Sequence, residues 1–168
     1  MSDNNRWIIA GIAGAFLGAW WTNEKFSRKT KSRAELEDPE FLEEVRSKIT
    51  NLLDEFDFEG DIESEDQFRD ALASFLESKA GFEIEVAPDT PHGKPDILVE
   101  DALALEIKLD PNKAEFDRLI GQCARYSRQW DTWILLVDSP ESKVGDFERL
   151  LSDKGLSYLP IIVFEEMN

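Results

Sequence analysis

The pattern of apolar and polar residues divides the chain into three parts. Residues 7–21 contain only apolar residues and glycine. From Pro39 to Phe56, apolar residues recur every three or four positions, which predicts an amphipathic helix. From Ser64 onward, short apolar runs alternate with helical patterns, which is typical of a compact α/β domain. We therefore divide the chain into a membrane-anchor segment (1–23), a basic linker with an acidic helix (24–60) and a globular domain (61–168).

The globular domain is expected to begin with a helix and to follow the order α-β-β-β-α-β, with a further helix and strand after it. Ser64 is a good helix N-cap, Gln67 completes a capping box, and Gly81 ends the helix. Alternation and apolar runs then predict strands Phe82–Val86, Asp96–Glu100, Leu103–Leu109, Thr132–Val137 and Leu159–Phe164, and helices Asn112–Trp130 and Val144–Leu151. The second and third strands are expected to form a hairpin. The helix before Gly60 is interpreted as a spacer or as a lid packed on the domain.

The apolar run at residues 7–21 would span roughly 22 Å as a helix, which is short of the roughly 30 Å hydrocarbon core of a bilayer. Tryptophans stand at both ends, and five basic residues follow between Lys25 and Arg33. This arrangement predicts a short membrane anchor that leaves the rest of the chain in the cytoplasm. A buried or oligomer-forming helix and a signal sequence are the alternatives, and without an anchor the chain is expected to be cytoplasmic. Gly14 and Gly18 fall four residues apart, which favours self-association.

Charge is distributed unevenly along the 168 residues, whose formal net charge is -17. Residues 1–34 carry +4, residues 35–66 carry -12, and the remainder carries -9. The composition therefore does not predict a broad basic groove for nucleic acid. The single cysteine, Cys123, excludes an internal disulfide and is expected to be a packed thiol.

The third predicted strand carries the residues on which a chemical function depends. Alternation places Glu106 and Lys108 on one face of an otherwise apolar strand. Asp96 opens the preceding strand, so a hairpin can bring it close to Glu106. Two converging carboxylates repel each other but suit Mg²⁺, a hard cation that prefers oxygen ligands. Lys108 would then orient a water molecule and offset negative charge in the transition state.

Two groups of residues resemble motifs of a known family. Pro95-Asp96 followed by Glu106-Ile107-Lys108 resembles the signature of the PD-(D/E)xK phosphodiesterase superfamily. Gly93 with Asp96, and Gln122 with Tyr126, are similar to the Gly-x-x-Asp and Gln-x-x-x-Tyr motifs of its RecB-like branch. That branch also carries a histidine upstream of the core, whereas this chain has none before His92, which is interpreted as a turn residue. The resemblance implies a restriction-endonuclease-like αβββαβ core, with a mixed sheet flanked by helices.

The resemblance also implies a role for each site residue. Asp96 and Glu106 would ligate Mg²⁺ or Mn²⁺, together with the backbone carbonyl of Ile107. An acidic residue on the first helix would complete the catalytic set. Glu65 is the candidate because it shares a face with the apolar residues of that helix, and Glu77 is the reserve.

Polar residues on the predicted helix after the third strand form one stripe, made of Arg118, Gln122, Arg125 and Tyr126. Such a stripe is either an ordinary solvated face or a surface that contacts phosphates and bases. Lys94, and Lys113 at the start of the helix, would add positive charge near the site.

The expected function is a metal-dependent nuclease that hydrolyses DNA and is tethered to the cytoplasmic face of a membrane. The choice of DNA is implied by the resemblance, and endonuclease and exonuclease activity both remain open. One alternative is a catalytically inactive nuclease fold that serves as a membrane-anchored interaction module. The other is a membrane assembly protein that self-associates through Gly14 and Gly18.

Overall fold

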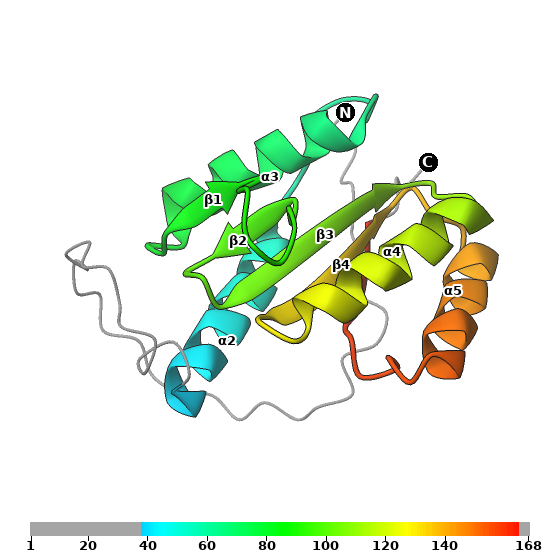
Figure 1. Cartoon of the computed structure of the whole chain (residues 1–168). Helices are drawn as coiled ribbons and strands as arrows, with labels where there is room; N and C mark the ends of the chain where they lie inside the picture. Colours follow the sequence, from blue (N-terminus) through cyan, green and yellow to red (C-terminus); the bar gives the residue numbers. More distant parts are fainter. Residues whose placement is uncertain (1–37, 165–168) are drawn as a thin grey trace.

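The computed structural model describes residues 38–164, in which a five-stranded mixed sheet lies between two layers of helices (Figure 1). The helices are α2 (Pro39–Glu55), α3 (Glu65–Lys79), α4 (Lys113–Tyr126) and α5 (Glu141–Asp153). The strands are β1 (Ile84–Val86), β2 (Ile97–Val99), β3 (Leu103–Leu109), β4 (Asp131–Val137) and β5 (Ile161–Phe164). The α/β class and the predicted order from α3 to β5 are confirmed.

Several elements are shorter than the patterns predicted. β2 begins one residue after Asp96, and β1 begins two residues after Phe82. α4 ends at Tyr126, not at Trp130, and after it the amides of Arg128 and Gln129 make the tighter bonds of a turn, to the carbonyls three residues back. These bonds turn the chain back toward β4. Side-chain periodicity alone continues through such a turn and does not reveal it.

The strands follow one another in space in the order β1-β2-β3-β4-β5. β1, β2 and β3 are antiparallel neighbours, whereas β3, β4 and β5 run parallel. The β2–β3 connection is the three-residue loop 100–102, in which Glu100 and Asp101 have positive φ and the Ala102 amide donates to the Val99 carbonyl at 2.9 Å. So short a loop fixes the register of the two strands. Ile97 therefore pairs with Leu105, and Asp96, one residue further out, lies opposite Glu106.

The alternation predicted for β3 is confirmed. Leu103, Leu105 and Ile107 enter a core that also contains the apolar faces of α2 and α3. On the other face of the sheet, α4 and α5 cover Ile134 and Leu136 of β4. Glu106 and Lys108 pair in register with these two β4 residues and share their face.

Helix α2 belongs to the core of the domain. Val45 and Ile49 are fully buried, and Leu52 and Leu53 are almost so, in the same cluster as the β3 residues. The interpretation of this helix as a separate spacer is therefore wrong, while the alternative that it packs on the domain is confirmed. At the start of α3, Ser64 caps the Gln67 amide as expected, but the Gln67 side chain accepts from Glu63 and not from Ser64.

The proposed anchor at residues 7–21 and the basic residues after it lie outside the described part of the chain. Among residues 38–164, no helix combines the length and apolar character needed to cross a membrane.

Candidate active site

The candidate site forms where β3 continues beyond the end of its neighbour β2. Pairing between the two strands ends at Ile97 and Leu105. The β3 edge beyond Leu105 therefore presents main-chain groups that no strand satisfies, and buried groups of this kind require other partners. Those partners are the side chains that the sequence singled out.

Two carboxylates occupy this open edge. Asp96 Oδ2 accepts a 2.8 Å hydrogen bond from the Ile107 amide. Glu65, at the first position of α3, accepts from the Leu109 amide through Oε1 at 3.4 Å. The structure thus brings Glu65 to the end of β3, where it lies with Asp96 along one strand edge. The reserve residue, Glu77, is exposed further along α3.

Lys108 crosses the same edge and joins these groups. Its Nζ donates to Glu65 Oε2 at 2.8 Å and to the Ile107 carbonyl at 2.6 Å, and it lies 3.9 Å from Glu106 Oε1. The lysine is 5% exposed, so burial acts to lower its pKa. The hydrogen bond to Glu65 and the charges of Asp96, Glu106 and Glu65 outweigh that effect and raise the pKa, so the ammonium form is retained.

Glu106 is the most deeply buried carboxyl of the site, at 1% exposed. Desolvation, followed by the nearby charge of Asp96, raises its pKa to about 8, although the ammonium of Lys108 acts in the opposite direction. The pKa of Asp96 is also raised, mainly by burial and despite the Ile107 hydrogen bond. Repulsion between Asp96 and Glu106 is therefore a property of this site, as the sequence led us to expect.

These residues fit a divalent cation in the chemistry of their donors. Glu106 Oε2 is buried without a hydrogen-bond partner, which is a costly condition for a carboxylate unless a cation or a proton reaches it. The Ile107 carbonyl and two carboxylates add the hard oxygen donors that Mg²⁺ prefers. Within residues 38–164, however, no three acidic, histidine or cysteine side chains converge as a ready-made metal cage. In this structure Lys108 contacts both Glu65 and the Ile107 carbonyl.

Arg69 is a charged neighbour of the site that the sequence interpretation missed. It lies one helical turn after Glu65, and its positive charge acts to lower the pKa of Asp96. Asp66 and Asp70 hold its guanidinium at 2.6 Å and 2.8 Å. The four-residue spacing from Glu65 was a usable signal, because residues so spaced share a helix face.

The α4 residues expected to form one contact stripe divide into two groups. Arg118 and Arg125 are exposed, and Lys94, also exposed, lies 3.8 Å from Asp89. Tyr126, in contrast, is 1% exposed and packs with Trp130, Leu98 and Ala104. Its expected place on a solvated stripe is therefore wrong, since its large ring fills the gap between α4 and the sheet. Gln122 is half-buried, and its Oε1 lacks a partner.

Two further residues have the structural roles expected of them. Cys123 is fully buried, and burial raises the pKa of its thiol, with the charge of Glu106 adding to the effect. His92 stands in the turn before Pro95, with its ring centroid 5.6 Å from that of Trp130. Neither residue belongs to the candidate site.

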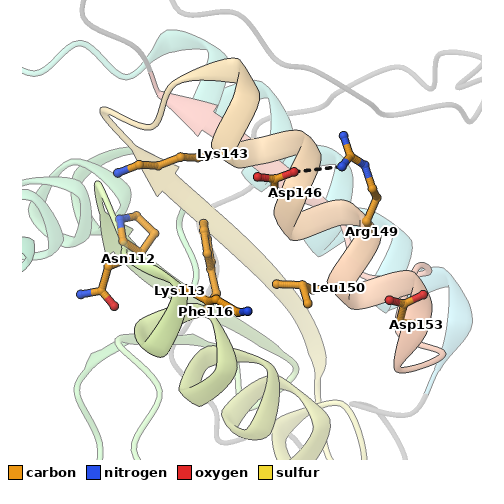
Figure 2. Close-up of a pocket in the computed structure, with 9 residues that line it drawn as sticks. Asn112, Lys113, Phe116, Lys143, Asp146, Arg149, Leu150 and Asp153 are labelled. Atoms are coloured by element: carbon orange, nitrogen blue, oxygen red, sulfur yellow. Dashed lines mark hydrogen bonds and ion pairs between the residues drawn. The ribbon is translucent and has the colours of Figure 1, made fainter.

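A hollow of about 400 Å³ lies apart from these carboxylates, between the first turn of α4 and the length of α5 (Figure 2). Lys113 and Lys143 border it, but Asp146 and Asp153 do so as well. Lys143 pairs with Asp110, and Asp146 pairs with Arg149 at 3.0 Å. The mixed charge and the absence of Asp96, Glu106 and Lys108 from its lining set this hollow apart from the candidate site.

Comparisons with family models, with curated proteins and with solved structures found no significant match to this chain.

Proposed function

We propose that this chain is a metal-dependent nuclease of the PD-(D/E)xK type that hydrolyses phosphodiester bonds of DNA with Mg²⁺ or Mn²⁺. The observation that carries the proposal is the gathering of Asp96, Glu106, Lys108 and Glu65 at the open edge of β3. The α-β-β-β-α-β order from α3 to β4 supports it, because this is the order implied by the resemblance of the motifs.

Each residue has a role in this proposal that follows from its position. Asp96 and Glu106 would hold the ion, and the Ile107 carbonyl would add a third oxygen. A divalent ion at this place supplies positive charge that polarises the phosphodiester and makes a water molecule more acidic. Lys108, released from the Ile107 carbonyl, orients the attacking water and offsets charge on the phosphate oxygens. Glu65 holds the Lys108 ammonium in reach of that water.

A second candidate function is an interaction module on the same fold. The net charge of -17 favours it, because so acidic a chain repels a polyanion. In this case the carboxylates at the β3 edge would serve only to satisfy its main-chain amides and Lys108.

Cleavage by the purified full-length chain separates the two candidates. Plasmid, linear and single-stranded DNA are incubated with Mg²⁺, with Mn²⁺ or with EDTA. We expect cleavage that requires the metal and that falls at least 100-fold in Asp96→Asn, Glu106→Gln and Lys108→Met, as is usual when charge-stabilising groups are lost.

The matched control is Glu148→Gln, which makes the same chemical change at an exposed position of α5 and should leave the rate unchanged. Cleavage that persists in all three site variants would show that another protein is responsible. A folded wild-type chain that cleaves none of the substrates would favour the interaction module.

The proposal includes a tether through residues 7–21, based on the sequence alone. We expect the full-length chain to sediment with membranes and to be released by detergent but not by high salt or alkaline carbonate. A chain that begins at residue 36 should remain in the soluble fraction. Sedimentation of both forms alike would remove the tether from the proposal and leave the nuclease unaffected.

A further inference from the structure

The turn that leads into Asp96 is held from outside the sheet by a residue of α4. Gly93 has φ +125°, a conformation open to glycine, and a Cβ placed on it would lie 2.8 Å from Tyr126 Cε1 and 3.3 Å from the Tyr126 hydroxyl oxygen. The ring of Tyr126 therefore packs directly against the Gly93 backbone. Because the ring is 1% exposed, solvent does not separate the two.

The polar end of Tyr126 also faces this turn. Burial, followed by the charge of Glu106, raises the pKa of Tyr126, whereas the Gln122 side chain and the Lys94 main chain beside its hydroxyl act to lower it. The hydroxyl thus connects two helical positions of α4 to the residue that follows Gly93. Replacing tyrosine by phenylalanine would keep the ring in place and remove only this connection.

The turn itself is short and stiff, so a restraint at Gly93 is transmitted to Asp96. Thr90 and Gly93 bond through their main chains in both directions, at 3.0 Å and 3.2 Å, and Thr90 Oγ1 donates to the Gly93 carbonyl at 2.6 Å. Pro95 is buried and limits rotation before Asp96.

Asp96 needs such a restraint because it stands one residue outside β2. Its carbonyl accepts from the Ala87 amide at 2.8 Å, and its Oδ2 accepts from Ile107. On the side before Asp96, the chain enters the site through the turn from Gly93 to Pro95.

We propose that Tyr126 is a positioning residue that clamps the Gly93–Pro95 turn and thereby holds the Asp96 carboxylate at the β3 edge where a divalent cation binds. The cation in this role depends on the proposed function. The position of Tyr126 against the turn depends only on the contacts described above. The side chain acts from inside the protein, where it does not reach nucleic acid.

Two measurements on the full-length chain test the clamp, with Tyr126→Phe as the variant. The first is Mn²⁺ binding by calorimetry without DNA. The second is native-state hydrogen exchange of the Ile107 amide by NMR, which reports directly on its bond to Asp96. Losing a buried hydroxyl's hydrogen bonds should weaken Mn²⁺ binding about tenfold and speed Ile107 exchange by a similar factor. The Leu135 amide in β4 should exchange as in the wild type.

The matched control is Tyr158→Phe. Tyr158 is 64% exposed, and its hydroxyl donates to Oγ of Ser127, the C-cap residue of α4, at 3.2 Å. The Tyr158→Phe variant should leave both Mn²⁺ binding and Ile107 exchange unchanged. Gly93→Ala, which introduces the 2.8 Å contact, should have a larger effect than Tyr126→Phe in the same direction.

Unchanged Mn²⁺ affinity together with unchanged Ile107 exchange in Tyr126→Phe would overturn the clamp. Equal acceleration at Ile107 and Leu135 would also overturn it, since that result indicates a general loss of stability. If the wild-type chain binds no Mn²⁺, the proposed function fails while Ile107 exchange still decides the clamp by itself.

Discussion

At the scale of the residue, Glu106 is the most buried carboxyl of the site, and burial together with the charge of Asp96 raises its pKa. In the folded chain its carboxyl keeps a proton up to about pH 8, whereas the unfolded chain loses that proton near the ordinary value of 4.5. Between these values the folded chain binds more protons, so its stability falls as the pH rises. The loss of folding stability caused by ionising Glu106 reaches its full size above about pH 8. The proposed cation site would have this property, because a bound ion would replace the proton.

Glu106→Gln is therefore expected to stabilise the metal-free protein while it abolishes cleavage. Glutamine has nearly the same shape but carries no charge to desolvate. We expect the free energy of unfolding in urea to exceed that of the wild type by roughly 1–3 kcal/mol at pH 8, and the difference to decrease toward pH 5. Urea titrations at both pH values with EDTA present provide the measurement. A variant less stable than the wild type at pH 8 would show that the ionised carboxylate is well satisfied.

At the scale of the element, α2 carries more of the fold than its place in the chain suggested. Its apolar face shares a core with β3, β4 and β5, and Phe56, just after it, packs edge-on against Phe68 and Phe164. Arg46 on the same helix bonds to Asp131 at 2.7 Å, at the start of β4. These contacts make α2 a support for the two strands that lie beside the site.

Ile49→Ala should accordingly destabilise the whole domain by about 2–4 kcal/mol, since it removes a fully buried side chain and leaves a cavity. Asn51→Ala, at an exposed position of the same helix, should change stability by less than about 0.5 kcal/mol. Urea unfolding followed by tryptophan fluorescence provides both values. Similar stability of Ile49→Ala and the wild type would mean that α2 is dispensable and that the core begins at α3.

At the scale of the whole molecule, the question is how so acidic a chain would bind DNA. Arg118 and Arg125 are exposed seven residues apart, two turns along α4. Lys94 is exposed on the turn that the same helix holds in place. A few exposed cations of this kind would give weak DNA binding that depends strongly on salt, because each phosphate contact releases a counterion.

Arg118→Ala and Arg125→Ala should each weaken DNA binding about threefold to tenfold and reduce the salt slope of the binding constant by about one. Fluorescence anisotropy with labelled DNA and Asp96→Asn protein, at several salt concentrations, measures both quantities without cleavage. Lys154→Ala, at the end of α5, is the control and should change neither value. If the slope is unaffected in both arginine variants, the stripe on α4 is an ordinary solvated face.

Local patterns determined the elements and much of the candidate site. Period-two alternation in β3 assigned Glu106 and Lys108 to one face, and the three-residue loop after Val99 placed Asp96 opposite Glu106. Both placements follow from interactions between residues close in sequence, and such local interactions can be predicted from the sequence pattern. The α3 face predicted for Glu65 is likewise a local property, and its contact with the β3 edge agrees with it.

Only the tertiary structure decided which groups meet across long stretches of chain. The place where β2 stops, the fit of Tyr126 onto Gly93, and the burial of α2 against β3 depend on how whole elements pack. Packing depends on the shapes of both contacting elements together, and the sequence pattern of one element does not specify the shape of the other. For the same reason the stripe on α4 looked uniform in sequence, yet divides in the folded chain into two exposed arginines and one buried ring.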